Sequence, residues 1–397
     1  MTDLVAAPEI RHLVRELRDS EFPWTAATTY LNNASIGPLP ERSRLALEAF
    51  NAKRTNPQQL PDRMLQGLLA DARAAAARLI GAEPEEIALA TNTTTGINVA
   101  ARSLPLASGE IVLVSDREFP ANVYPWLALK DKGVATELAP VTARGWPDED
   151  YLVGRLADPR VKVLAVSFVQ FSNGYRADLA RLSAACRAHG VHLVVDAIQG
   201  LGNSPLDVRE VPIDILATGG QKWLLSPFGT GFTYIRRGLI EQMRPTFTGW
   251  AAFEGTDDYT NLVKYTDELR HDARRFEIGT IPFQDMLGMT TSLGLLGELT
   301  VEAIATYTRS LAEPLLAWAR ETGVRVVSPT DERHRSAIVC LAPDNAAEAH
   351  KRLKAAGVVC AFREGAIRLS PHFFNTLDEI EKVLDVLDDA GRKRFPI

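Results

Sequence analysis

Short apolar runs alternate with helical stretches between about residues 87 and 235. The runs are rich in β-branched residues, which is typical of buried strands. Strands that alternate with helices in this way predict a mainly parallel sheet with helices on its faces. The predicted strands are residues 87–90, 111–115, 161–168, 191–195, 213–217 and 231–235.

One of the intervening helices is marked clearly. Residues 179–189 place apolar side chains at helical spacing, and Gly190 follows as a suitable helix end. The strands on either side complete a strand–helix–strand unit of ordinary size. The fold class expected for this part of the chain is therefore α/β.

The C-terminal part has a different pattern. A long helical stretch opens at about Val301, strands are expected at 324–327 and 337–341, and further helices at Ala346 and Leu377. This arrangement predicts a smaller α+β domain. Residues 247–285 are rich in Gly, Asp and aromatic residues with weak periodicity, so we expect them to bridge the domains as loops.

Composition narrows the class of protein. The chain has 397 residues, 46% of them hydrophobic, which is enough for a large core. With 44 basic and 50 acidic residues the net charge is −6, so nucleic acid and acidic membranes are not expected partners. Neither a membrane span nor a signal segment is visible, which predicts a soluble, cytoplasmic protein.

The cysteines suggest no special chemistry. Cys186, Cys340 and Cys360 lie far apart without paired spacing. Neither a disulfide framework nor a metal site is therefore expected, and each cysteine is first interpreted as a small buried apolar residue.

Asp196 is the first candidate for chemistry. It closes the predicted strand 191–195, and open α/β sheets bind ligands at the carboxyl ends of their strands. A carboxylate there needs a cation or hydrogen bonds, and a protonated pyridine nitrogen would be such a partner. Taken alone, Asp196 is equally well explained as a structural or capping carboxylate.

Lys222 is the second candidate. It stands in a glycine-rich turn after the strand 213–217, 26 positions beyond Asp196 (222 − 196). Desolvation lowers the pKa of a lysine and makes its amine nucleophilic, which suits Schiff-base formation. A surface lysine remains the simpler interpretation of this turn by itself.

A threonine-rich segment, Thr91-Asn-Thr-Thr-Thr-Gly-Ile-Asn98, follows the first predicted strand and leads into a helix. Free N–H groups at a helix start, with the hydroxyls of Thr93 and Thr94 beside them, can bind a phosphate. An ordinary Ser/Thr helix cap is the alternative. The three pieces follow strand ends of one sheet, and their joint occurrence favours a ligand site.

With these motifs in place, the chain resembles the class V aminotransferases, which are fold-type I enzymes and include cysteine desulfurases, kynureninase and isopenicillin N epimerase. The resemblance runs from Tyr30-Leu-Asn-Asn-Ala34 to Arg368-Leu-Ser-Pro-His-Phe-Phe-Asn-Thr376. It implies a seven-stranded-type sheet and pyridoxal 5′-phosphate as cofactor. It also implies a large domain at 29–285 and a small domain formed by the N-terminal helical segment 1–28 and residues 286–397.

The resemblance assigns roles to particular residues. Lys222 would hold the cofactor as a Schiff base, Asp196 would bind the pyridine nitrogen, Gln199 would lie near the phenolic oxygen and Phe119 would stack on the ring. The family's serine and histidine before the lysine are replaced in Gly219-Gly-Gln-Lys222, which leaves Gln221 and Thr218 as possible phosphate ligands.

Further roles concern the substrate and the partner subunit. Gly279 and Thr280 would reach the phosphate of the neighbouring subunit, which implies a homodimer with sites at its interface. Arg368 would bind the substrate α-carboxylate, for which a guanidinium is well suited, although a surface salt bridge is the alternative. Other pocket candidates are Asn32, Asn33, Gln170, Tyr175, Trp250 and Arg363.

Departures from the family pattern limit the reaction. No cysteine loop precedes Arg368, and Phe119 replaces a desulfurase histidine, so persulfide-forming desulfuration is not expected. Transamination of a small amino acid is the leading hypothesis. β-elimination, including C–S lysis, and epimerisation remain open, and a cofactor-binding protein without turnover is a further alternative. His372 is expected to have a solvated or capping role.

Overall fold

The computed structural model describes residues 8–392. Its centre is a seven-stranded sheet in the order β2-β8-β7-β6-β5-β3-β4. Strands β4, β3, β5, β6 and β7 run parallel, whereas β8 is antiparallel to both β7 and β2. The predicted α/β class with a mainly parallel sheet is therefore confirmed. The strands are β2 Ile87–Leu89, β3 Ile111–Ser115, β4 Ala135–Ala139, β5 Val161–Ser167, β6 His192–Asp196, β7 Ile215–Gly219 and β8 Gly231–Ile235.

Successive strand residues point to opposite faces of the sheet, and each face has its own core. Leu113, Leu164 and Val195 pack in one hydrophobic cluster. Their neighbours Val112 and Val194 pack in a second. Because both faces are covered, the strands are apolar throughout, which is why most of them could be predicted. The covering and flanking helices are α2 Glu41–Arg54, α3 Asp62–Ile80, α4 Thr93–Ser103, α5 Tyr124–Leu127, α6 Glu149–Arg155, α7 Leu179–His189, α8 Arg237–Ile240 and α9 Phe283–Leu299.

A glycine brings α4 close to the sheet. A Cβ added at Gly96 would lie 2.6 Å from the Cβ of Ala217 and 2.4 Å from Oγ1 of Thr233. Only glycine therefore allows the first turn of α4 to lie directly on β7 and β8. This contact fixes the position of the threonine-rich segment at the helix start.

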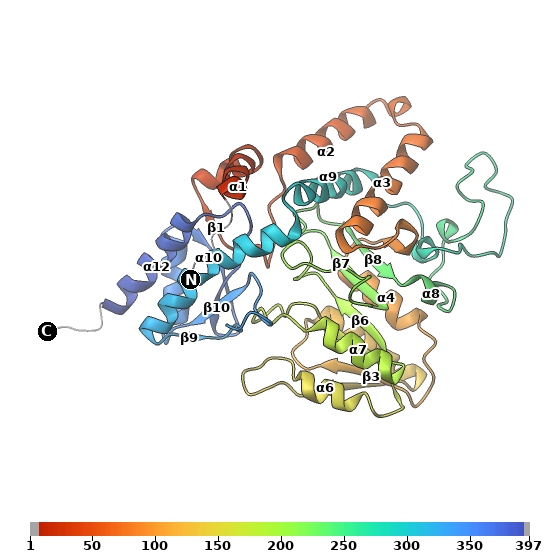
Figure 1. Cartoon of the computed structure of the whole chain (residues 1–397). Coiled ribbons are helices and arrows are strands. Elements are labelled where there is room, and N and C mark those ends of the chain that lie inside the picture. The colour runs from red at the N-terminus through yellow and green to blue at the C-terminus, as the bar shows by residue number, and fades with distance from the viewer. Residues whose placement is uncertain (1–7, 393–397) are drawn as a thin grey trace.

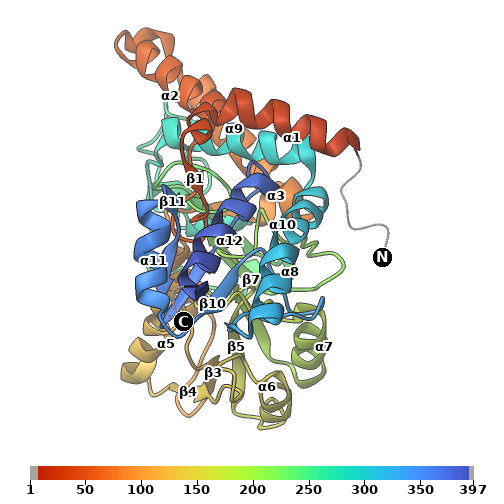
Figure 2. The same cartoon turned by 90° about the vertical axis from the view of Figure 1, so that its left-hand side faces the viewer.

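The C-terminal elements form a second group, blue in Figure 1 and facing the viewer in Figure 2, with α1 Pro8–Glu21 close by. Their antiparallel sheet has the order β12-β13-β10-β9. Strand β1 Thr29–Tyr30 pairs with β11 Val358–Val359, so the N-terminal segment is joined to this group. The remaining elements are α10 Val301–Thr322, β9 Arg325–Val326, β10 Val339–Ala342, α11 Ala346–Ala355, β12 Ala361–Arg363, β13 Ala366–Leu369 and α12 Leu377–Arg392.

Helix α9 was not predicted, and it packs against α2 and α3 (Figure 1). The predicted domain boundary between 285 and 286 falls within this helix. The division into domains at 28/29 and 285/286 stays a prediction.

The segment 247–285 is a loop segment as expected, but it lies in a different part of the molecule from the one expected. Up to the start of α9 it contains only two short 3-10 turns, η6 Trp250–Ala252 and η7 Ala273–Phe276, as a loop segment should. However, Gln66 of α3 donates a hydrogen bond to the carbonyl of Asp257, and the segment lies at the side of the molecule opposite the C-terminal group (Figure 1). The expectation that it bridges the domains is wrong.

None of the helices in the part of the chain that the structure describes has the length and apolar character that a membrane span requires.

Candidate active site

Asp196 and Lys222 lie at the same edge of the sheet. Asp196 is the last residue of β6, and its register partner on the parallel neighbour β7 is Ala217. Lys222 follows the end of β7 by three residues (222 − 219). Parallel neighbours end at the same edge, so the strand order itself brings the carboxylate and the amine together.

The carboxylate of Asp196 is buried and only half satisfied. Its exposed fraction is 1%, and Oδ1 accepts a hydrogen bond of 3.1 Å from the backbone of Ile198. Oδ2 is buried without a hydrogen-bond partner among residues 8–392. Burial raises the pKa of Asp196 to about 6, while Ile198 and the charge of Lys222 oppose the rise. A cationic partner at Oδ2 would remove this cost.

The amine of Lys222 is prepared for nucleophilic chemistry. Its pKa is lowered to about 8, mainly by burial and to a smaller extent by the positive charges of Arg368 and Arg363, while Asp196 opposes the shift. Nζ lies 5.6 Å from the centre of the Phe119 ring. Phe119 itself packs edge-on against Phe171 at 5.3 Å, which leaves a face of its ring toward the lysine. The alternative of an ordinary surface lysine does not fit these surroundings.

The turn that carries Lys222 is held from distant parts of the chain. The backbone N–H of Gly37 donates to the carbonyl of Gln221 at 2.8 Å. A Cβ added at Gly37 would lie 1.9 Å from the carbonyl oxygen of Lys222, so glycine is required there. Leu225, in the same turn, has a φ of 52°, a left-handed conformation that is uncommon for leucine.

His372 also holds this turn, which corrects the expectation of a solvated or capping residue. Its side chain is fully buried, and Nε2 lies 3.1 Å from the carbonyl oxygen of Trp223. Nδ1 accepts a hydrogen bond from the N–H of Phe373, so Nε2 carries the proton. Burial lowers the pKa of His372 to about 4, which keeps the ring neutral. His372 therefore orients the residue next to Lys222.

Gln199 and the residues around Lys222 form one framework. Gln199 donates from Nε2 to the carbonyl of Ala34 at 2.9 Å and accepts from Trp223 Nε1 at 2.8 Å. Thr218 donates to the carbonyl of Gly219, and Gln221 folds back over the same glycine. These residues surround the lysine turn, and their predicted contacts with a cofactor stay predictions.

The N-terminal end of α4 can bind an anion. Asn92, not a threonine, caps the helix: its side chain accepts from the N–H of Thr95 at 3.0 Å. The hydroxyl of Thr93 is buried and has no partner in the described chain. Thr94 lies at a cavity of about 500 Å³ beside the helix start. The ordinary cap is thus supplied by another residue, and the Thr93 hydroxyl is left for a ligand.

Arg368 is a buried cation that has no counter-ion among residues 8–392, so it does not form the surface salt bridge of the alternative interpretation. It is 2% exposed and donates from its two terminal nitrogens to the carbonyl of Phe171 at 2.6 Å and to Ser35 Oγ at 2.7 Å. Nε has no hydrogen-bond partner among the described residues, and burial lowers the pKa of Arg368 to about 10. Such a group favours a bound anion.

Of the other predicted pocket residues, some lie near the lysine site and others do not. Oδ1 of Asn32 and of Asn33 is buried and unpaired within the described chain, close in sequence to Ser35. Tyr175, by contrast, donates to Glu149 and stacks on His334, so it has no evident role at Lys222.

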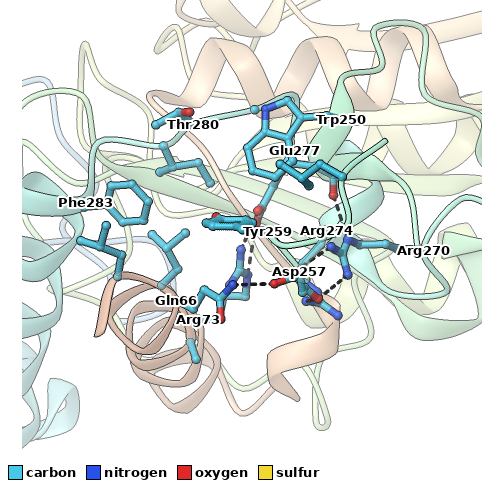
Figure 3. A pocket seen from close by; sticks show the side chains of 17 residues that line it. Gln66, Arg73, Trp250, Asp257, Tyr259, Arg270, Arg274, Glu277, Thr280 and Phe283 are labelled. Carbon is cyan, nitrogen blue, oxygen red and sulfur yellow. Dashed lines mark hydrogen bonds and ion pairs between the residues drawn. The ribbon is translucent and has the colours of Figure 1, made fainter. Parts of the chain in front are cut away.

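Gly279 and Thr280 line a separate cavity of about 530 Å³, shown in Figure 3. Trp250 lies on the same cavity, whereas Asp196 and Lys222 do not line it. Within one chain, the structure does not bring these residues to the lysine. Their predicted contact with the cofactor of a partner subunit stays a prediction.

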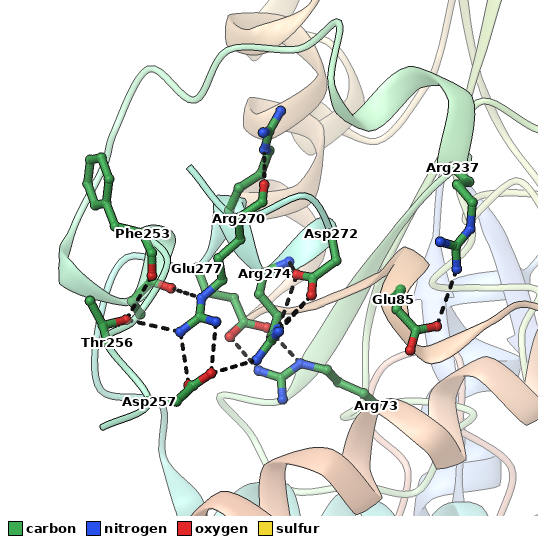
Figure 4. A network of polar contacts seen from close by, with 12 residues as sticks. Arg73, Glu85, Arg237, Phe253, Thr256, Asp257, Arg270, Asp272, Arg274 and Glu277 are labelled. Atoms are coloured by element: carbon green, nitrogen blue, oxygen red, sulfur yellow. Dashed lines mark hydrogen bonds and ion pairs between the residues drawn. The ribbon is translucent and has the colours of Figure 1, made fainter. Parts of the chain in front are cut away.

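A polar network fixes the segment that leads to Gly279 (Figure 4). Arg270 donates to both carboxylate oxygens of Asp257 at 2.9 Å. Glu277 is paired with Arg73 of α3 and accepts a hydrogen bond from the N–H of Leu89 in β2. The segment is therefore tied to the large sheet rather than free to move.

Glu118 is a buried carboxyl that the sequence analysis missed. Glu118 follows the end of β3 and stands directly before Phe119. Its place after a parallel strand, at the same sheet edge as Asp196, is the signal that could have identified it. It accepts hydrogen bonds from the N–H of Ser167 at 2.8 Å and from Gln170 Nε2 at 2.6 Å. Burial and the nearby Asp196 raise its pKa to about 7, although the Ser167 donors oppose the rise.

This shift predicts a pH dependence of stability. The folded state holds the Glu118 proton more tightly than the unfolded chain, whose pKa is 4.5. The contribution to the free energy of unfolding is therefore full below 4.5 and is lost as the pH rises through about 7. At about 1.4 kcal/mol per pKa unit, the loss is on the order of 3 kcal/mol.

Urea unfolding of the cofactor-free wild type and of Glu118→Gln at pH 5 and pH 8 measures this contribution. Wild type should lose stability relative to the variant between the two values. An identical pH dependence of both proteins would show that Glu118 does not titrate in this range.

The residues at Lys222 fit pyridoxal phosphate. A buried carboxylate oxygen, a buried hydroxyl at a helix start and an amine of lowered pKa have no hydrogen-bond partner within the part of the chain that the structure describes. They match a pyridine nitrogen, a phosphate and an aldehyde, respectively. The three belong to neighbouring elements of one sheet edge.

Comparison with known proteins gives a family and several relatives. Residues 29–383 match the family model Aminotransferase class-V. An uncharacterized aminotransferase, YcbU of Bacillus subtilis, is 31% identical over 78% of this chain and 80% of its own. The isopenicillin N epimerase of Amycolatopsis lactamdurans is 31% identical over 92% and 96%. A probable cysteine desulfurase of Aeropyrum pernix is 27% identical over 93% and 96%.

Solved structures agree in fold. Apo cysteine desulfurase from Thermococcus onnurineus superposes with a TM-score of 0.85 at 20% identity and covers 98% of this chain and 100% of its own. A variant of C-DES with glycine covalently linked to its pyridoxal phosphate superposes with a TM-score of 0.85 at 23% identity, over 94% and 99%. At these identities the likeness concerns the fold.

Proposed function

The chain belongs to the aminotransferase class-V family as a pyridoxal 5′-phosphate enzyme, and we propose that it transaminates a small amino acid. The observation that carries this proposal is the half-buried amine of Lys222, which has no hydrogen-bond or ion-pair partner among residues 8–392 and lies among Asp196, Phe119 and Arg368. These groups supply a nucleophile, an anion, an aromatic face and a carboxylate-binding cation at one place.

The chain's own residues divide the work. When bound, the cofactor stores the electron pair that remains at the substrate Cα after its proton has been removed. Oδ2 of Asp196 would hold the pyridine nitrogen, and Thr93 Oγ1 with the start of α4 would hold the phosphate. Arg368 would orient the substrate carboxylate, and Lys222 Nζ would take the proton from Cα.

Persulfide-forming desulfuration finds no support in the thiols. Burial raises the pKa of Cys186 and Cys360 to about 12 and that of Cys340 to about 11. Cys360 packs against the small hydrophobic cluster around Leu353 and Ile367. A thiolate nucleophile requires a lowered pKa and access to the substrate. All three cysteines have a raised pKa, and Cys186 and Cys340 are buried as well.

Epimerisation is the second candidate, because two relatives of 30–31% identity over most of the chain carry that name. Inversion at Cα needs an acid on the side opposite the base. Phe119 and Phe171 offer an apolar surface that cannot move a proton. Elimination remains the other alternative and differs only in what happens at Cβ.

A product screen tests the proposal. The purified holoenzyme is incubated with an amino-acid panel in the presence and absence of a 2-oxo-acid acceptor. A transaminase yields a new 2-oxo acid only with the acceptor. Acceptor-independent pyruvate would establish elimination instead, and loss of optical purity without any new product would establish epimerisation.

A homodimer follows from the same proposal. Gly279 and Thr280 line a cavity apart from Lys222 and are proposed to contact the phosphate in a partner subunit. Exposed apolar side chains such as Phe247 and Tyr265 stand on the same segment and are suitable for burial against that subunit.

Arg368→Ala is expected to raise KM for the true substrate on the order of 10- to 100-fold, because a charge-assisted hydrogen-bonded pair is lost. Cofactor content, measured by absorbance after release in alkali, should not change. A KM equal to that of wild type would remove Arg368 from the substrate site.

A further inference from the structure

Arg363 and Arg368 lie on one face of the same hairpin. Strands β12 and β13 pair antiparallel with Ala361 opposite Arg368 and Arg363 opposite Ala366. Residues directly opposite each other share a face, as do residues two positions apart in a strand. The two arginines are therefore diagonal neighbours, and the only side chains between them on these strands are the small ones of two alanines.

The turn of this hairpin fixes that arrangement. Glu364 has a φ of 45° and Gly365 a φ of 78°, which is the pattern of a two-residue type I′ turn. A non-glycine residue with positive φ is unfavourable and persists where the surrounding structure requires it. Because a shift of one residue would send Arg363 to the other face, the turn determines where its guanidinium points.

That face lies on the lysine side of the hairpin. Arg368 donates to the carbonyl of Phe171, whose ring packs against Phe119 at 5.3 Å, and Nζ of Lys222 lies 5.6 Å from the centre of the Phe119 ring. In agreement with this placement, the positive charges of Arg368 and Arg363 contribute to the lowered pKa of Lys222.

Arg368 is anchored by Phe171 and Ser35, which use two of its five N–H groups, and the remaining three, Nε–H included, can hold one carboxylate. Arg363 is exposed and forms no hydrogen bond or ion pair with a described residue. Its positive charge therefore adds to the charges of Lys222 and Arg368, and no carboxylate among the described residues is paired with it.

We propose that Arg363 binds a second anionic group, so that the substrate is an amino acid with an acidic side chain. The inference rests on the proposed function and specifies its substrate class. The α-carboxylate occupies Arg368, and the side-chain carboxylate reaches the diagonal neighbour, whose Cβ lies about 7 Å away. The second anion neutralises the charge that Arg363 otherwise leaves unpaired beside the lysine.

Matched amino acids test this specificity. Aspartate and asparagine, and glutamate and glutamine, have nearly the same shape and differ in charge. We expect wild-type holoenzyme to prefer the acidic member of a pair in kcat/KM by on the order of 10- to 100-fold. Arg363→Met, which keeps the length of the side chain, should bring that ratio close to one. Arg363→Lys should retain most of it, and Arg54→Met, an exposed arginine on α2, should leave it unchanged.

A binding experiment separates this inference from the proposed reaction. Succinate and butyrate lack an amine, so their effect on the Tm of the holoenzyme does not depend on turnover. Succinate should raise Tm more than butyrate in wild type and in Arg54→Met, but not in Arg363→Met. If no amino acid reacts but this difference is found, the acidic subsite stands and the proposed reaction fails. Equal use of acid and amide, or equal effects of both ligands on wild type, would overturn the subsite.

Discussion

Lys222→Ala is expected to lower kcat/KM on the order of 10⁴-fold, because the variant loses both the nucleophile that holds the cofactor and the proton acceptor at Cα. The physical basis is the low pKa of Lys222, about 8, which leaves part of the amine unprotonated near neutral pH. The visible absorption band of the lysine-bound cofactor should disappear in the same variant.

The matched control for this experiment is Lys354→Ala. Lys354 is exposed on α11, in the C-terminal group, and should be replaceable without effect on turnover or spectrum. A Lys222→Ala enzyme that keeps a tenth of the wild-type rate would assign the chemistry to another group. Unchanged thermal stability of the cofactor-free variant would exclude misfolding as the cause of a loss.

Asp196→Asn is expected to lower kcat on the order of 10²- to 10³-fold. This is the usual loss when one preorganised group that stabilises charge is removed from an active site. Asparagine keeps the shape and can still accept the hydrogen bond from Ile198. It lacks the negative charge that keeps the pyridine nitrogen protonated and the ring able to accept electrons. Cofactor should still bind through Lys222, so the loss should appear in kcat rather than in cofactor content.

Asp214→Asn is the control for a half-buried carboxylate on the same sheet. Asp214 stands at the opposite end of β7, where it accepts hydrogen bonds from Leu193 and Arg236. Its loss should affect stability and leave kcat nearly unchanged. An Asp196→Asn enzyme within threefold of the wild-type kcat would contradict the assigned role.

The sequence predicted the sheet well where burial is complete. Strands β3 and β8 and helix α7 were predicted at their observed limits, because both sheet faces are apolar and Gly190 ends the helix. Strand β4 was missed because it forms the edge of the sheet, and four of its five residues are exposed or half-buried. Helix α9 was missed because its buried residues surround it, so no amphipathic stripe marks it.

The sequence predicted those site residues that stand at the carboxyl ends of strands. Asp196 ends β6, and Lys222 and Thr93 follow β7 and β2. These three strands run in the same direction, so their carboxyl ends lie at one edge of the sheet. The environment of Glu118 depends on donors from the end of β5, about 50 residues away in sequence. The partner of His372 is separated from it by 149 residues. Periodicity contains no information on pairings of this kind.

The lysine turn also has a consequence for the order in which the chain folds. Gly37 contacts the turn at Gln221, and His372, 335 residues later (372 − 37), contacts it at Trp223. Contacts between residues so far apart in sequence form late, because a long loop must close first. We therefore expect a refolding chain to regain its helices before it binds its coenzyme, so that the helical circular-dichroism signal returns ahead of the visible absorption band.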